Sequence, residues 1–150
     1  LIMEFGIINF VNALIVVFIL IPNIIYAMKG GEDHKADNGV VTFLEQVGRY
    51  ASIAMMILPL GVWKFGFPNV LALLVYLAGD MVLLIGYWIA WGSYIKKKTY
   101  SIAMILAVIP VCIFLVTGFC LHHWLLCACA VVFGCCHIYI TRQNEKSPPS

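Results

Sequence analysis

Residues 99–141 read TYSIAMILAVIPVCIFLVTGFCLHHWLLCACAVVFGCCHIYIT, and these 43 residues contain no Asp, Glu, Lys or Arg. As a single helix the stretch would measure roughly 65 Å, about twice the thickness of the hydrocarbon core of a bilayer. The stretch therefore predicts a hairpin of two membrane-spanning helices. We expect the turn at residues 118–124, where a glycine, two histidines and a tryptophan cluster.

Three further apolar stretches precede this hairpin, and each is long enough to cross a bilayer as a helix. The sequence thus predicts an all-α integral membrane bundle of five transmembrane helices in one domain, residues 1–141, with a polar cytoplasmic tail at residues 142–150. The helices are expected at residues 5–28, 40–63, 69–95, 100–119 and 124–141.

The composition of the whole chain agrees with this class. Of its 150 residues, 63% are hydrophobic and only 11% are charged, whereas soluble domains average about 45–50% apolar and about 25% charged residues. This composition excludes a soluble globular protein, a disordered chain and a protein that binds nucleic acid.

The positions of the basic residues predict an orientation. With the N-terminus on one side and five crossings, one side carries seven cations and the other side carries Lys64 alone. The seven are Lys29, Lys35, Lys96, Lys97, Lys98, Arg142 and Lys146. The positive-inside rule then places the N-terminus outside and the C-terminus in the cytoplasm. We expect a multi-pass protein of the plasma (inner) membrane.

Polar residues follow one face of the first expected helix, at Asn9, Asn12, Asn23 and Tyr26. Pro22 precedes Asn23 and frees a carbonyl near Phe18, which either becomes a ligand or bends the helix. Two interpretations of this face remain open: hydrogen bonds between helices and the lining of a cavity.

The second expected helix carries Glu45, Gln46 and Arg49 near its inner end. The spacing of four residues places Glu45 and Arg49 on one face, close enough to pair. Because Asn23 and Tyr26 lie at a similar depth, we expect one polar cluster of all five residues. The alternative is that this segment lies among lipid headgroups, with Arg49 reaching a phosphate.

The third expected helix carries Asp80 near the middle of the membrane. Asn69, Tyr76, Tyr87, Trp91 and Tyr94 share its face. A charged group at this depth is costly and commonly marks an ion or substrate site. A carboxyl there can exchange a proton for a cation, and the aromatic rings could contact an organic cation. The alternatives are a structural carboxyl, either neutral or paired with Arg49, and simple aromatic packing.

Small residues spaced by seven form a second stripe on the same helix, at Ala72, Gly79, Gly86 and Ser93. Such a stripe allows a neighbouring helix to approach closely. We therefore expect residues 69–95 to form the central helix of the bundle.

All six cysteines lie in the hairpin, without a C-x-x-C spacing. They are expected to pack as small apolar side chains rather than to hold copper or zinc. His137 has no histidine counterpart at its depth, so haem is not expected. We expect no metal and no other cofactor.

Two runs resemble small multi-spanning bacterial membrane proteins of unassigned function. They are IPNIIYA at residues 21–27 and EQVGRY at residues 45–50, and they cover only the first two helices. The resemblance implies no activity, substrate or cofactor. It does place Pro22, Asn23, Glu45 and Arg49 together as residues of interest.

The favoured function is a small transporter or transporter subunit, including proton-coupled movement of a cation or small molecule. Its site would lie between the first three helices. The expected binding residues are Asp80, Glu45, Arg49, Asn23, Tyr26, Gln46, Tyr76 and Tyr87. The alternatives are a non-catalytic accessory or interaction protein and an intramembrane enzyme acting on a lipid-like substrate. The expected partners are the lipid bilayer and further copies of the chain or a larger membrane complex, without nucleic acid.

Overall fold

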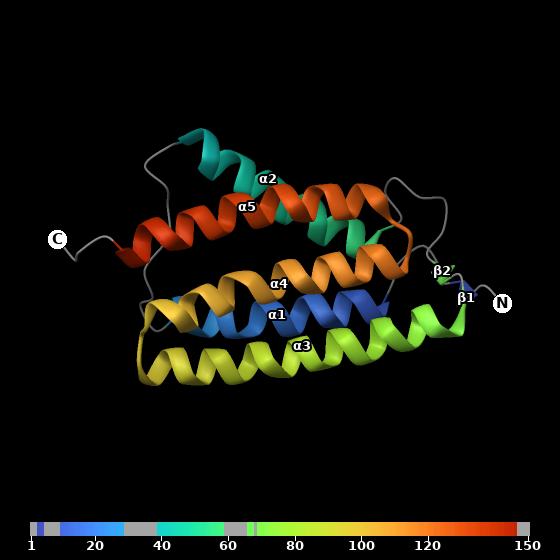
Figure 1. Ribbon diagram of the computed structural model, residues 1–150, viewed down its shortest axis with the longest axis horizontal. Helices are drawn as coiled ribbons and strands as arrows, with labels where there is room; N and C mark the ends of the chain where they lie inside the picture. The colour runs from blue at the N-terminus through green and yellow to red at the C-terminus, as the bar shows by residue number, and fades with distance from the viewer. Residues whose placement is uncertain (1–2, 5–9, 29–38, 59–65, 68, 147–150) are drawn as a thin grey trace.

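In the computed structural model, the described residues form five helices that run alternately in opposite directions (Figure 1). The structure describes residues 3–4, 10–28, 39–58, 66–67 and 69–146. The helices are α1 (Phe10–Met28), α2 (Gly39–Ile57), α3 (Val70–Lys96), α4 (Tyr100–Cys120) and α5 (Trp124–Lys146). A two-residue antiparallel pairing that the sequence did not predict joins β1 (Met3–Glu4) to β2 (Gly66–Phe67).

Local sequence explains most helix ends. The side chain of Asn69 accepts a hydrogen bond from the backbone N–H of Ala72 at 2.8 Å and caps α3. Thr99 caps α4 in the same way, through Ile102. Between α4 and α5 the chain turns at Leu121 and His122, and His122 adopts the left-handed conformation with φ of 53°. The predicted hairpin is therefore present.

Two predicted boundaries are wrong. The helix predicted to reach residue 63 ends at Ile57, because Leu58 precedes Pro59 and a residue before proline disfavours the helical region. The tail predicted from residue 142 continues α5 to Lys146. Gln143 hydrogen-bonds the hydroxyl of Tyr139 one turn earlier, which supports this extension. The predictions for Asn9, for the loop at residues 29–38 and for residues 59–63 lie outside the described residues.

Three described helices are long and apolar enough to cross a membrane: Val70–Lys96, Tyr100–Cys120 and Trp124–Gln143. In α1, the apolar segment Asn12–Tyr26 is shorter. α2 carries Glu45 and Arg49 and does not reach the same apolar length.

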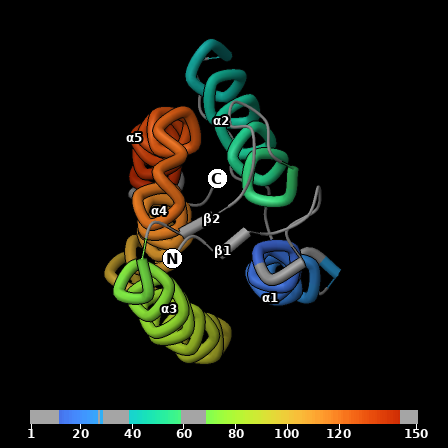
Figure 2. The backbone as a smooth tube through the Cα atoms, turned by 90° about the vertical axis from the view of Figure 1, so that its right-hand side faces the viewer, coloured from blue at the N-terminus to red at the C-terminus, as the bar shows by residue number. Residues whose placement is uncertain are grey.

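The helices form two layers, with α3, α4 and α5 in one and α1 and α2 in the other (Figure 2). α4 packs against α3 on one side and α5 on the other, and α2 packs on α5. α1 contacts both α2 and α3, but much less extensively than α2 contacts α5 or α4 contacts α3 and α5. Half of the α4 span is buried, compared with 17% of the α3 span. α4 is therefore the central helix, and the prediction for residues 69–95 is wrong.

The closest helix approaches also differ from the predicted stripe. A Cβ atom at Gly86 would have no neighbour within 4 Å. A Cβ at Gly48 of α2 would lie 2.9 Å from the backbone nitrogen of Phe133 in α5. Gly134 of α5 is a second such position, because a Cβ there would lie 2.7 Å from a side-chain atom of Val111 in α4. Of the predicted stripe, Gly79 makes an ordinary contact, since its Cβ would lie 3.5 Å from Val116 of α4.

Candidate functional site

Two asparagine–tyrosine hydrogen bonds join α1 to α3. The Tyr76 hydroxyl donates to Oδ1 of Asn12, and Nδ2 of Asn23 donates to the Tyr87 hydroxyl at 2.7 Å. Each pair is separated by 64 residues of sequence, so the two bonds are eleven residues apart on both helices. Eleven residues make about three helical turns. The two bonds therefore lie along one line of contact between the parallel helices α1 and α3, which we call the seam.

A third bond crosses the same seam. The indole Nε1 of Trp88 donates to the carbonyl oxygen of Phe18 at 2.9 Å. That carbonyl would normally accept from the backbone N–H of residue 22, which is proline and has none. The carbonyl predicted to be free thus accepts a hydrogen bond from the neighbouring helix.

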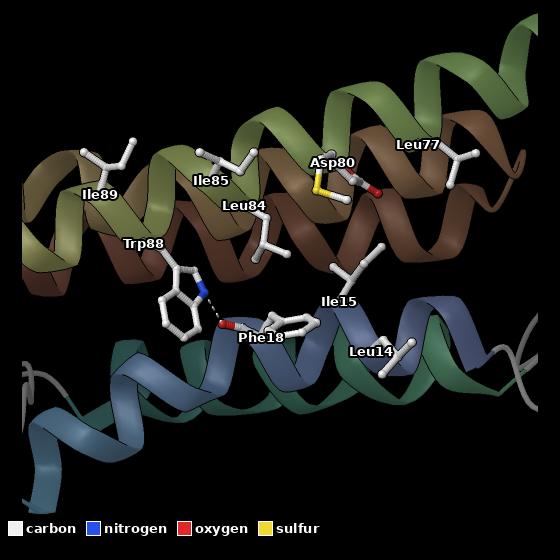
Figure 3. Close-up of a pocket in the computed structure, with 10 residues that line it drawn as sticks. Leu14, Ile15, Phe18, Leu77, Asp80, Leu84, Ile85, Trp88 and Ile89 are labelled. Carbon is white, nitrogen blue, oxygen red and sulfur yellow. Dashed lines mark hydrogen bonds between the residues drawn. The ribbon is translucent and has the colours of Figure 1, made fainter.

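A cleft of about 530 Å³ lies between α1 and α3 (Figure 3). Its walls are almost entirely apolar and come from both helices. The lining residues are Leu14, Ile15, Phe18, Leu77, Asp80, Met81, Leu84, Ile85, Trp88 and Ile89. Several of them, including Leu14, Met81 and Ile89, are exposed on the outside of the bundle. The cleft is therefore a groove whose rim lies on the outer surface.

Asp80 is the single ionisable residue among these lining residues. Its side chain is 2% exposed, and Oδ2 accepts a hydrogen bond from the Thr117 hydroxyl of α4 at 2.7 Å. Within the described part of the chain, Oδ1 has no hydrogen-bond partner and no cationic side chain pairs with the carboxyl. The Tyr76 hydroxyl and the Cys120 thiol are close enough to interact with the Asp80 charge. One oxygen of this carboxyl is thus hydrogen-bonded to α4, and the other is buried without a hydrogen-bond partner among the described residues.

Glu45 lies at the centre of a second cluster, between α2 and α5. The carboxyl is 3% exposed, pairs with Arg49 as the spacing predicted, and lies 3.3 Å from Nδ1 of His137. The guanidinium of Arg49 lies 5.8 Å from the centre of the Phe133 ring, and that ring stacks on His137 at 5.0 Å. This cluster can hold charge inside the bundle because its acid and its bases meet each other.

The predicted cluster of five polar residues is divided in two. Among the described residues, no hydrogen bond or ion pair joins Glu45, Gln46 or Arg49 to Asn23 or Tyr26. Tyr26 instead packs against Trp91 and Tyr94 of α3, with ring centres 5.2 and 5.9 Å away. The reason is that α2 packs on α5, whereas α1 meets α3 through its polar face.

The aromatic face predicted around Asp80 is present. Tyr76, Tyr87, Trp91 and Tyr94 are buried with Asp80, and Asn69 is the cap of the same helix. Arg49 pairs with Glu45 rather than with Asp80, so the structural alternative that joined Asp80 to Arg49 is wrong.

Two residues that matter here could not be found from the sequence. Thr117 is an isolated hydroxyl in a charge-free run, and only the packing of α4 on α3 brings it to Asp80. His137 gave no sign of its pairing with Glu45, because the two residues are 92 positions apart in the sequence. The six cysteines are free thiols, and no three His, Cys, Asp or Glu side chains of the described residues converge as a metal site would require.

Comparison of the chain with protein-family models, with curated proteins and with solved structures found no match. The bonds between α1 and α3, the groove beside them and the two buried carboxyl groups are therefore the features that indicate a function.

Proposed function

We propose that the protein is a small multi-pass membrane transporter, or a transporter subunit, that moves a cation or small cationic molecule in exchange for protons. The observation that carries this proposal is Asp80, a residue of the groove lining whose carboxyl has one oxygen held by Thr117 and the other buried without a hydrogen-bond partner in the part of the chain that the structure describes. A carboxyl without a cationic partner inside a membrane commonly marks an ion or substrate site.

The exchange requires only that two occupants compete for one carboxyl. A proton on Asp80 neutralises it, and loss of that proton creates a negative charge that a cation can neutralise instead. Thr117 would orient the carboxyl, and Tyr76 and Tyr87 would hold the adjoining wall in place. Glu45 and Arg49 would form an inner ion pair that orients or gates the site, with Gln46, Asn23 and Tyr26 as polar wall.

The membrane arrangement is part of the proposal. Five crossings in a bacterial plasma membrane, with the N-terminus outside, fit the alternating helix directions and the seven-to-one distribution of cations. The pairing of Glu45 with Arg49 and His137 reduces the free-energy cost of placing the charged side chains of α2 inside the bilayer. Five helices enclose little volume, so assembly into a homo-oligomer belongs to the same proposal.

Ligand binding by the purified protein in detergent tests this function. A panel of Na⁺, K⁺, divalent metals and organic ammonium ions should raise the thermal midpoint in a pH-dependent way for at least one cation. Asp80→Asn should remove the response, while Thr117→Ser, which keeps the hydroxyl donor, should retain it. If no cation changes the midpoint at any pH, the protein is not a transporter of this kind. An accessory protein would then be the better description.

A further inference from the structure

We propose that the occupant of the groove is a lipophilic monoamine that enters sideways from the bilayer, with its ammonium at Asp80 and its apolar body along α1 and α3. This inference depends on the proposed function and specifies the substrate class for the same site.

The lining of the groove determines the charge of the ligand. One carboxyl among nine apolar or aromatic lining side chains can neutralise one positive charge, and nothing in that lining would solvate a second. A dication or a strongly hydrated metal ion would lose its water without replacement ligands. A single ammonium on an apolar body matches both the carboxyl and the walls.

The position of Asp80 along the groove determines the direction of the ligand. On α3 the lining runs from Leu77 to Ile89, so the carboxyl lies close to one end. From Asp80 to Ile89 the groove continues for nine residues, about 13 Å of helix. An ammonium bound at Asp80 would thus direct its apolar chain towards Trp88 and Ile89.

The depth of Asp80 favours a free amine over the headgroup of a phospholipid. The residue lies ten positions after Val70, about 15 Å along α3, which is half of a hydrocarbon core about 30 Å thick. A phospholipid amine is kept at the interface by its phosphate. An amine whose only charge is the ammonium can reach the middle of the membrane by losing a proton and regaining it at the carboxyl.

The route into the groove is lateral. Leu14, Leu77, Met81 and Ile85 are exposed on the outer surface of the bundle, where they would face acyl chains. The opposite wall of Asp80 is closed by Thr117 of α4. A ligand dissolved in the bilayer could therefore reach Asp80 between α1 and α3 without crossing the bundle.

Tryptophan fluorescence provides a test of both the site and the direction. The full chain would be placed in nanodiscs of phosphatidylcholine and phosphatidylglycerol, and titrated with decylamine that carries bromine at its tail end. Bromine quenches a tryptophan that it contacts, so we expect saturable quenching of Trp88. Trp88→Phe should remove the saturable part of the quenching. Trp124→Phe, at the turn between α4 and α5, should retain it.

Matched variants separate binding in the groove from partition into lipid. Asp80→Asn and Leu84→Phe should each lower the affinity measured from the saturable quenching at least tenfold. Val82→Phe, on the exposed face of α3, should leave that affinity unchanged. Brominated decanol, which lacks the charge, should give only the non-saturable component. Within the amine series each added methylene should tighten binding about fourfold until the groove is filled. Ile15→Phe, from the α1 wall, repeats the test if Leu84→Phe does not fold.

The other outcomes overturn specific statements. If quenching is equal for the amine and the alcohol and is insensitive to Asp80, the monoamine site does not exist. If the amine fails while an inorganic cation still gives an Asp80-dependent thermal response, this inference is wrong and the transport function stands. If neither responds, both are wrong. If brominated phosphatidylethanolamine alone gives the Asp80-dependent signal, the occupant is a lipid headgroup.

Discussion

The indole of Trp88 donates its N–H to the carbonyl oxygen of Phe18, which lies four residues before Pro22. A proline usually weakens a helix by removing one internal hydrogen bond. Here the freed acceptor is used to join α1 to α3, beside the groove. The same proline thus loosens one helix and attaches it to another.

The bond between Trp88 and Phe18 should depend on Pro22. Trp88→Phe keeps most of the aromatic contact but removes the donor, and we expect it to lower the free energy of unfolding by about 1 kcal/mol. Pro22→Ala restores a backbone N–H that can satisfy Phe18 within α1. In that background, Trp88→Phe should cost less, as a double-mutant cycle in detergent would measure. Equal costs in the two backgrounds would show that the bond contributes nothing.

Gly48 should tolerate no side chain. A Cβ there would lie 2.9 Å from backbone and side-chain atoms of Phe133, so Gly48→Ala should separate α2 from α5 and destabilise the protein by about 1–3 kcal/mol. Gly86→Ala is the matched control, because a Cβ at that position meets nothing within 4 Å. It should stabilise the protein by up to about 1 kcal/mol through helix propensity. Thermal midpoints of the two variants would then move in opposite directions.

Removing one charge of the Glu45–Arg49 pair should lower the free energy of unfolding more than removing both charges. Arg49→Gln leaves a buried carboxylate with only His137 beside it, and should cost about 2 kcal/mol, a value reduced because the Arg49 side chain is 34% exposed. Adding Glu45→Gln to that variant should recover part of the loss. Chemical unfolding of the two single variants and the double variant measures this. Additive losses would mean that the two side chains do not act as a pair.

Reporter fusions test the orientation. With the C-terminus in the cytoplasm, green fluorescent protein fused after Ser150 should fluoresce, and alkaline phosphatase fused at the same position should be inactive. Replacing Lys96, Lys97 and Lys98 with glutamine should weaken this preference, because these residues supply three of the seven cations on that side. An active phosphatase at the C-terminus of the unmodified chain would overturn the orientation.

Features with a strong periodic signal were predictable from the sequence. Long apolar stretches located the five helices of the described residues and the hairpin turn, and the spacing of four residues located the pair of Glu45 and Arg49. The face of α3 that contains Asp80 was also correct, since a helix alone determines which of its residues share a face.

Features that depend on which helices are neighbours were not predictable. The small stripe on α3 suggested a central position, but the glycines at close approaches between helices include Gly48, against Phe133, and Gly134, against Val111. Thr117 meets Asp80, and His137 meets Glu45, across helices whose packing is determined by many weak contacts. The groove likewise exists only because α1 touches α3 through a few polar bonds.

The equal separation of the two asparagine–tyrosine pairs has a consequence for biosynthesis. Asn12 and Asn23 each bond a tyrosine that is made 64 residues later. At about 5–20 residues per second, a ribosome needs about 3 to 13 s to add those residues. During that time the Asn23 amide can donate to the Ile19 carbonyl within α1, and the Asn12 amide can donate to the Met56 carbonyl once α2 is made. Oδ1 of Asn12 still has to be accommodated by other means, such as the insertion machinery, until Tyr76 is made. Slowing translation between residues 29 and 69 should therefore increase degradation of the newly made chain.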